Sequence, residues 1–242
     1  GQFTMAHAVT FGPDGNLYVG DRPAPGQGKI SRFDGLTGTF IDDFVPAGSG
    51  GLSHPVGHLF GPSGIPGQLD LYVSDEDTFN VLRYDGTTGA FVGTFVAAGS
   101  GGLEFPFGMT FGPDGNLYVA DVGYLGETRA ILRYQGPARP SPGAFIDAFV
   151  PAGSGGLRQP LGLLFGPDGN GDGQQDLYVN SQVIDPRTFD TLPRTSSVKR
   201  YDGVTGAYID DFVPIASNGG LHGPNLMTFT QTDPVTLEYL GD

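Results

Sequence analysis

Short apolar runs alternate along the whole chain with turns that are rich in glycine, proline and aspartate. Runs of this length between such turns are typical of β-strands and too short for most helices. In the stretch Phe11-Gly-Pro-Asp-Gly-Asn-Leu-Tyr-Val19, two apolar runs flank a Pro-Asp-Gly-Asn turn. The pattern therefore predicts an all-β protein built from hairpins.

This hairpin recurs three more times, at 60–73, 111–119 and 165–179, so that the copies lie roughly 50 residues apart. Two further apolar runs and a glycine-rich return such as 46–52 follow each copy, which predicts a four-stranded antiparallel meander per repeat. A surface loop at 181–197 interrupts the fourth repeat. We expect strands at 3–11, 17–21, 29–34 and 39–45; at 56–60, 71–75, 81–85 and 90–96; at 107–111, 117–121, 131–135 and 144–150; and at 161–165, 177–180, 198–202 and 207–213.

The pattern begins a fifth time, with matches to the first two strands at 225–231 and 236–240. Such sheets carry apolar residues on both faces, so neighbouring repeats must stack, and a closed ring buries every face. We predict a single domain over 1–242, a five-bladed β-propeller with an incomplete last blade; a four-bladed ring with a loosely attached C-terminal hairpin is the alternative. The repeats cover about 3–52, 53–103, 104–157 and 158–221, with a partial copy at 222–242.

The stretch Phe111-Gly-Pro-Asp-Gly-Asn-Leu-Tyr-Val-Ala-Asp121, followed by Ile131-Leu-Arg-Tyr134, resembles the NHL-type β-propeller repeat. The glycine-rich returns also resemble the repeats of secreted bacterial surface proteins. The resemblance covers nearly the whole chain and implies the propeller fold. It leaves the function open, because that fold hosts lyases, binding platforms and structural modules.

One hairpin loop carries a set of oxygen ligands at alternate positions. Asp168, Asn170, Asp172 and Asp176 occupy loop positions 1, 3, 5 and 9, Gly173 allows the chain to turn inward, and the Gln174 carbonyl suits position 7. The spacing is similar to the FG-GAP calcium loops of integrin-type propellers. We expect a structural Ca²⁺ here; an aspartate-rich turn without metal is the alternative.

All four histidines fall between seven and two positions before the phenylalanine that ends the first strand of a repeat. In a propeller this window lies at the mouth of the central channel, where related metal-dependent lyases gather histidine ligands. Ordinary packing or rim polarity explains them more simply, and His58 in particular lies inside a predicted strand. The candidate channel-mouth residues are His7, His54, His58 and His222.

An arginine recurs in the third strand of every repeat, at positions 32, 83, 133 and 200. Aspartates recur near the end of the second strand, at positions 21, 75 and 121. Because a catalytic residue is usually needed once, we interpret the recurrence as structural pairing of these arginines with these aspartates.

The formal charge of −14 and the absence of clustered basic residues argue against nucleic acid and anionic membranes as partners. No apolar run is long enough for a transmembrane helix. A calcium loop of modest affinity would favour an extracellular location, where Ca²⁺ is plentiful.

The sequence thus favours a non-enzymatic extracellular module of a bacterial surface or matrix, stabilised by calcium. It would bind another surface protein or a glycan, or would self-assemble by strand complementation of its unfinished blade. The alternative is a propeller lyase or hydrolase with a histidine-lined site at the channel mouth.

Overall fold

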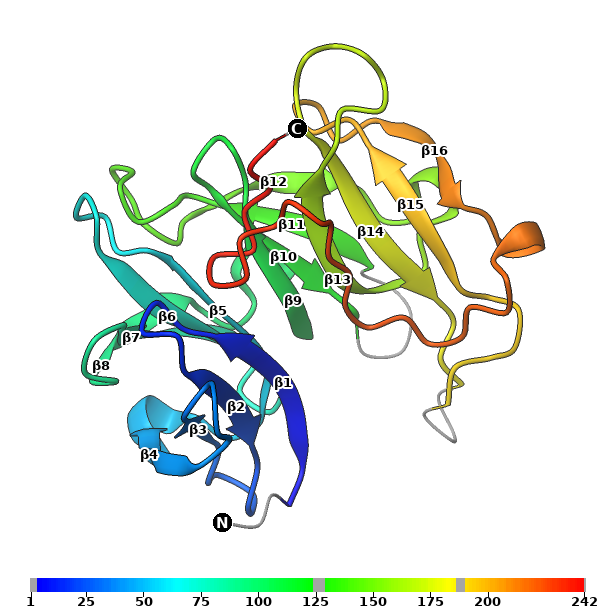
Figure 1. The fold of residues 1–242 in the computed structure, drawn as a ribbon. Helices are drawn as coiled ribbons and strands as arrows, with labels where there is room; N and C mark the ends of the chain where they lie inside the picture. Colours follow the sequence, from blue (N-terminus) through cyan, green and yellow to red (C-terminus); the bar gives the residue numbers. More distant parts are fainter. Residues whose placement is uncertain (1–3, 124–128, 186–189, 242) are drawn as a thin grey trace.

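The computed structural model describes residues 4–123, 129–185 and 190–241. It contains four four-stranded antiparallel sheets, and each sheet follows the order of the sequence, so every sheet is a meander (Figure 1). This confirms the predicted all-β propeller architecture. Blade 1 contains β1 (Ala6–Phe11), β2 (Leu17–Asp21), β3 (Lys29–Phe33) and β4 (Phe40–Val45); blade 2 contains β5 (Pro55–Pro62), β6 (Leu69–Asp75), β7 (Asn80–Asp85) and β8 (Phe91–Val96); blade 3 contains β9 (Pro106–Phe111), β10 (Leu117–Asp121), β11 (Ala130–Tyr134) and β12 (Phe145–Val150); blade 4 contains β13 (Gln159–Gly166), β14 (Asp176–Gln182), β15 (Ser197–Tyr201) and β16 (Tyr208–Val213).

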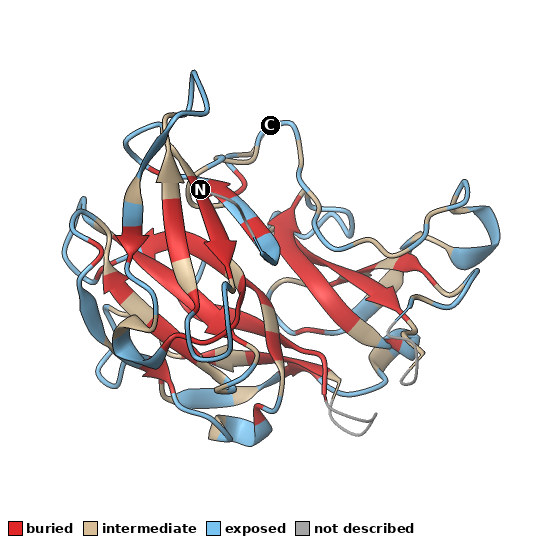
Figure 2. Ribbon diagram, turned by 90° about the horizontal axis from the view of Figure 1, so that it is seen from below, coloured by how far each residue is buried: buried red, intermediate tan, exposed pale blue. Residues whose placement is uncertain are grey.

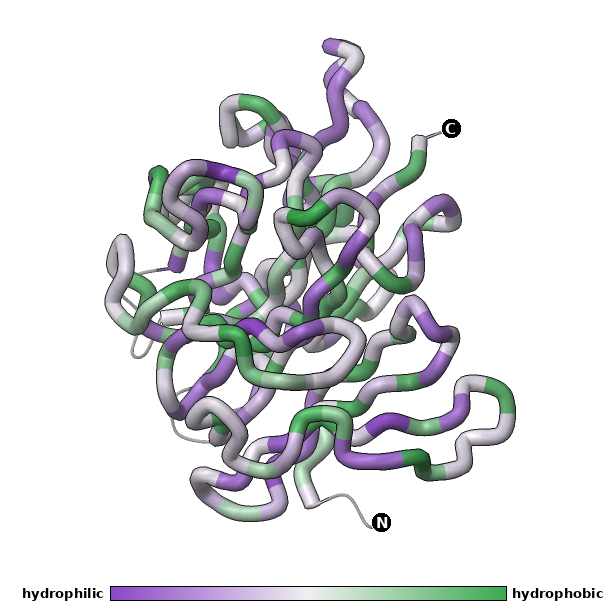
Figure 3. Tube along the Cα trace, turned by 90° about the vertical axis from the view of Figure 1, so that its left-hand side faces the viewer, coloured by the Kyte–Doolittle hydropathy of each residue, from purple (hydrophilic) through white to green (hydrophobic). Residues whose placement is uncertain are grey.

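The predicted strand positions agree closely with the observed ones. The second strands of blades 1 and 3 match in full, and most other boundaries move by one or two residues. The largest change is in the first strand, which was expected from residue 3 and begins at Ala6; residue 3 itself lies outside the described residues. Hydrophobic and hydrophilic positions are interleaved at short intervals along the chain (Figure 3), which is the pattern that identified the strands.

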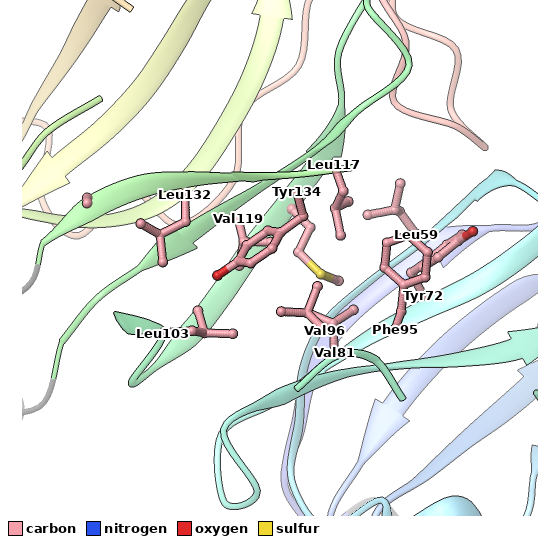
Figure 4. Packing of buried hydrophobic residues seen from close by; sticks show 12 residues of the cluster. Leu59, Tyr72, Val81, Phe95, Val96, Leu103, Leu117, Val119, Leu132 and Tyr134 are labelled. Carbon is pink, nitrogen blue, oxygen red and sulfur yellow. The ribbon is translucent and has the colours of Figure 1, made fainter. Parts of the chain in front are cut away.

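Successive blades are joined by buried hydrophobic clusters. One cluster joins blades 1 and 2, a second joins blades 2 and 3 (Figure 4), and a third joins blades 3 and 4. At the centre of the second interface, the Tyr72 ring packs edge-to-face on Phe95 of its own blade and on Phe111 of the next blade. Tyr18 and Tyr118 make the same pair of contacts in their blades. The recurring Leu-Tyr-Val of the sequence is therefore the device that stacks the blades.

A hydrogen bond reinforces each interface. The hydroxyl groups of Tyr84, Tyr134 and Tyr201 donate to the carbonyl oxygens of Ser49, Ser100 and Ser154, which lie in the 3₁₀ turn of the preceding blade. Buried residues accordingly concentrate in the strands, whereas the connecting loops are exposed (Figure 2).

The blades form an open arc in which blade 4 is not joined to blade 1 by any buried cluster of the described residues. Phe11 in β1 is 42% exposed, whereas Phe60 and Phe165 at the equivalent positions are 0% and 2% exposed and Phe111 is half-buried. At the other end, Phe212 in β16 is 50% exposed, whereas its equivalent Phe149 is 4% exposed. We call the surface around Phe11 the near face of blade 1 and the surface around Phe212 the far face of blade 4.

The C-terminal segment occupies the place of a fifth first strand without forming one. Phe229 packs edge-to-face on Tyr178, as Phe111 does on Tyr72, and the Asn225 carbonyl lies so close to Gly162 that a Cβ there would collide with it. Among residues 218–241, however, the described backbone pairing is one isolated bridge, between Thr232 and Tyr239. The predicted strands at 225–231 and 236–240 are therefore not present as a ladder.

The reason lies in the last turn. Asp233 accepts hydrogen bonds from the backbone N–H groups of Val235 and Thr236, as Asp202 does from Val204 and Thr205 in the turn between β15 and β16. The segment thus has the chemistry of a turn between third and fourth strands instead of first and second. It turns back across the middle of the arc (Figure 1), where Val235 and Leu237 pack against the clusters of blades 1 and 2 and of blades 2 and 3.

The expected pairing of the recurrent arginines with the aspartates of the second strand is wrong. Arg32, Arg133 and Arg200 instead form ion pairs of 2.5–2.6 Å with aspartates of the fourth strand, Asp42, Asp147 and Asp210. Arg83 faces Gly93 at that position and pairs with Asp70. The aspartates at the end of the second strand accept backbone N–H groups from the entry of the first strand, as Asp121 does from Phe105.

Candidate functional site

A cavity of about 630 Å³ lies where the first strands of several blades begin, on the side of the long returns. Residues from all four blades line it, together with the C-terminal segment. Its apolar wall includes Phe105, Phe107, Val122, Leu161 and Ile184, and its polar wall includes His7, Glu76, Arg129, Gln159, Gln182, Asp190, Thr191 and Asn225. This volume is in the range of pockets for small molecules.

The structure brings two of the four candidate histidines together. His7 lines the cavity, and its Nε2 lies 3.0 Å from Nε2 of His54. His58 is buried in the interface of blades 1 and 2, where its Nε2 lies 3.3 Å from the Tyr18 carbonyl. His222 is exposed and does not line the cavity.

The histidine pair is held by a polar network between blades 1 and 2. The Arg22 guanidinium lies 3.3 Å from His54 Nδ1 and forms a 2.9 Å ion pair with Asp77. Because an arginine always donates, His54 Nδ1 must accept, so His54 carries its proton on Nε2 and donates it to His7. His54 Nδ1 is also 3.7 Å from Glu76, but an ion pair there would require a proton where Arg22 already donates.

Burial lowers the pKa of His7, and the positive charge of Arg22 lowers it further. Burial likewise lowers the pKa of His54, with further contributions from His7 and Arg22. Both imidazoles are therefore neutral at pH 7, as their shared hydrogen bond requires. No group of three or more histidine, aspartate or glutamate side chains among the described residues is placed to hold a metal ion.

Two polar side chains of the cavity lack partners among the described residues. Arg129 forms no ion pair there, and its Nε has no hydrogen bond. Gln182 is 2% exposed, and its Oε1 has no hydrogen bond. Buried polar atoms of a protein are normally satisfied, so a water or ligand in this part of the cavity would find free hydrogen-bonding groups here.

The sequence analysis identified neither Arg129 nor Gln182, because neither belongs to a motif or a periodic position. The available signal was the loop inserted into the fourth repeat, predicted at 181–197. Its described residues Gln182, Ile184, Asp190 and Thr191 line the cavity, whereas 186–189 lie outside the described residues.

The candidate calcium loop forms the turn between β13 and β14, at the opposite end of the blade. Its carboxylates accept N–H groups of the loop itself: Asp168 accepts from Gly171 and Gly173, and Asp176 Oδ2 accepts from Gly169. Gln174 donates its own N–H to Asp172.

One atom of this loop remains unsatisfied. Asp176 is 1% exposed, and its Oδ1 has no hydrogen bond among the described residues. Burial raises the pKa of Asp176, and repulsion from Asp168 and Asp172 contributes to the increase. A cation would compensate this charge, and the carboxylate oxygens that already accept N–H groups keep a second lone pair for it. The donor types present therefore suit a calcium ion, but the carboxylates of this described loop are not gathered around one point.

No protein-family model matches the chain, and no characterised protein matches it in sequence. Solved structures do match in fold. Hydrazine synthase of Kuenenia stuttgartiensis is 16% identical with a TM-score of 0.57, over 87% of this chain and 52% of that one. An auxiliary nutrient-binding protein of Bacteroides thetaiotaomicron is 13% identical with a TM-score of 0.52, over 86% and 47%.

A catalytically inactive virginiamycin B lyase of Staphylococcus aureus, solved with quinupristin, is 16% identical with a TM-score of 0.50, over 87% of this chain and 55% of that one. The chain thus spans about half the length of the structures it matches. At these identities the likeness concerns the fold alone. No helix of the described residues is long and apolar enough to cross a membrane.

Proposed function

We propose that this chain is a non-enzymatic binding or self-assembling module that works in an extracellular setting, on a bacterial surface or in a matrix. Its NHL-like repeats supply a rigid scaffold, and the ends of the arc supply the contact surfaces. The observation that carries the proposal is the exposure of Phe11 and Phe212, whose equivalents inside the arc are buried apart from the half-buried Phe111. Apolar sheet faces of this kind are interaction surfaces in soluble proteins.

A second copy of the chain fits these faces best. Residues 225–231 pack on blade 4 where the first strand of a fifth blade would lie. They have no neighbouring strand among the described residues. A strand supplied by another molecule would pair with this segment and cover Phe212. Because the near and far faces differ, such contacts are head-to-tail and produce either a closed ring or a filament.

Introducing a charged residue at the far face of blade 4 tests the proposed self-assembly. We expect the purified chain to form concentration-dependent oligomers in sedimentation velocity, and rings or filaments in electron microscopy. Phe212→Asp should return it to a monomer, because a carboxylate would be buried without a partner. Leu36→Asp is the control, since Leu36 is 95% exposed in a turn. A wild-type chain that remains monomeric at high concentration would contradict self-assembly.

We further propose that Ca²⁺ binds the loop of blade 4, in the manner of FG-GAP loops. Asp168, Asn170, Asp172 and Asp176 would supply side-chain oxygens and Gln174 its carbonyl. Support comes from the ligand spacing and from the unpartnered Oδ1 of Asp176. The ion would be structural, because it would neutralise carboxylates that otherwise repel one another.

Calorimetric titration with Ca²⁺ tests this site. We expect one bound ion, and an increase in unfolding free energy of about 2.7 kcal/mol at a hundredfold excess over Kd. Asp168→Asn should abolish both effects. Asp114→Asn changes the equivalent aspartate of the short hairpin in blade 3 and should leave them intact. Equal calcium responses in the two variants would refute the assignment.

A lyase or hydrolase is the second candidate, and the hydrogen bond between His7 and His54 at the cavity favours it. Because His54 donates to its Nε2, His7 would carry its proton on Nδ1 and could donate it to a negative charge that develops on the substrate, with His54 fixing this tautomer. Turnover of a polysaccharide or small ester that is lost in both His7→Gln and His54→Gln would establish an enzyme. Unchanged turnover in both variants would eliminate these residues from catalysis.

A further inference from the structure

The cavity combines an arginine without an ion-pair partner among the described residues, an unsatisfied amide oxygen and an aromatic wall. We propose that it binds an acidic sugar, or an equally hydroxylated small carboxylate. This site is separate from the open faces and from the calcium loop, so it stands or falls independently of the proposed function.

The cation is the guanidinium of Arg129. Within the described residues it has no ion-pair partner, and the nearby Arg158 adds positive potential, which together with burial lowers the pKa of Arg129. A half-buried arginine in such surroundings is stabilised by an anion, and a carboxylate matches the planar fork of its N–H groups.

The acceptor atoms of the cavity favour a ligand that donates hydrogen bonds. Gln182 Oε1 is buried without a partner, and Glu76 and Asp190 add carboxylates to the same wall. Leaving a buried acceptor unpaired costs free energy, so a hydrogen bond from a ligand hydroxyl to Gln182 Oε1 would be favourable. A simple fatty acid would satisfy Arg129 but leave Gln182 unpaired, whereas a sugar acid would satisfy both.

The aromatic wall fits the body of a sugar. Phe105 and Phe107 enter the cavity together with Leu161. The C–H face of a pyranose ring is apolar and packs well on such side chains, while its rim carries the hydroxyl groups. With a cavity of about 630 Å³, the site accommodates one or two sugar units.

Three probes test the proposal by calorimetry or saturation-transfer NMR: D-glucuronate, D-glucose, which lacks the carboxylate, and hexanoate, which lacks the hydroxyls. We expect glucuronate to bind at least tenfold more tightly than either of the others. A galacturonate oligomer that binds more tightly than galacturonate itself would identify the end of a polysaccharide as the ligand. The reverse order would identify a free sugar acid.

Two variants assign the contacts. Arg129→Gln should weaken glucuronate binding by about 10- to 100-fold, the range for a lost charged hydrogen bond. Gln182→Leu should weaken glucuronate but not hexanoate. Arg139→Gln is the matched control, because Arg139 lies in the turn after β11 and outside the cavity. Unchanged thermal unfolding verifies that each variant is folded.

Equal affinity for glucuronate and glucose would overturn the proposal, and so would full glucuronate binding by folded Arg129→Gln. Absence of binding by all three probes would overturn it as well. None of these results depends on oligomerisation or on calcium.

Discussion

At the scale of single residues, the same side chain recurs in every blade but its partner does not. Arg133 forms an ion pair with Asp147 on the adjacent strand. Arg83 lies opposite Gly93 at the same register and forms its ion pair with Asp70 instead. The sequence shows that an arginine recurs but not which acid it reaches, because strand register decides that. Pairing was therefore predictable, and the partner was not.

His58 gives the clearest prediction at this scale. Its complete burial lowers its pKa from the ordinary 6.5 to about 4. The folded protein thus binds a proton less readily than the unfolded chain, so stability is full above pH 6.5 and falls as the pH drops towards 4. Between pH 7.5 and 4.5 this residue should cost about 2.5 kcal/mol of unfolding free energy.

Urea unfolding of wild type and His58→Leu at the two pH values measures this contribution. The difference in stability between them should change by that amount in favour of the variant at low pH. His222→Gln serves as the control, since it removes an exposed histidine outside the blade interfaces. Parallel pH curves for wild type and His58→Leu would contradict the assignment.

At the scale of elements, the glycine-rich returns are the most demanding parts of the repeat. Gly101 has a φ of 64°, and a Cβ there would collide with the Phe145 ring, which belongs to β12 of the following blade. Gly102 has a φ of 91°, with open space around its missing Cβ. Two adjacent glycines therefore differ in what they require.

Gly102→Ala should cost about 1 kcal/mol, because its backbone lies in the left-handed region. Gly101→Ala should cost about 3 kcal/mol, since displacement of Phe145 adds to the same backbone strain. Chemical denaturation of both variants measures the two costs. Equal costs would mean that Phe145 moves freely.

The strands themselves were predictable because each hairpin carries its own turn chemistry, as the Pro-Asp-Gly-Asn of 13–16 does. The C-terminal hairpin misled the same reasoning. Phe229 matches a first strand and holds that position, but Asp233 begins a turn of the other type. Local chemistry prevailed there over the repeat, and the ladder did not form.

At the scale of the whole molecule, the open arc could not be derived from the sequence, because closure depends on the angle between blades. The cavity was equally hidden, since Arg129 and Gln182 reach it from different blades and carry no common motif. The candidate calcium loop could be proposed from the sequence because all of its expected ligands are local.

Blade position should determine protection against hydrogen exchange. Blades 2 and 3 are packed on both sides, whereas blades 1 and 4 each have an open face. We expect amides of β6 and β10 to exchange most slowly, and those of β16 to exchange much faster. Mass spectrometry of exchanged peptides measures this order in a dilute sample, and uniform protection would show that the arc unfolds as one unit.

The turn at 233–237 links blade 4 to clusters that include residues as early as Tyr18. Most other contacts lie within a blade or join it to its neighbour, so the blades can form one after another. Because this contact closes a long loop, we expect Val235 and Leu237 to dock late, after the folding transition state. Weakening the packing of Val235 and Leu237 should then accelerate unfolding while leaving the folding rate nearly unchanged.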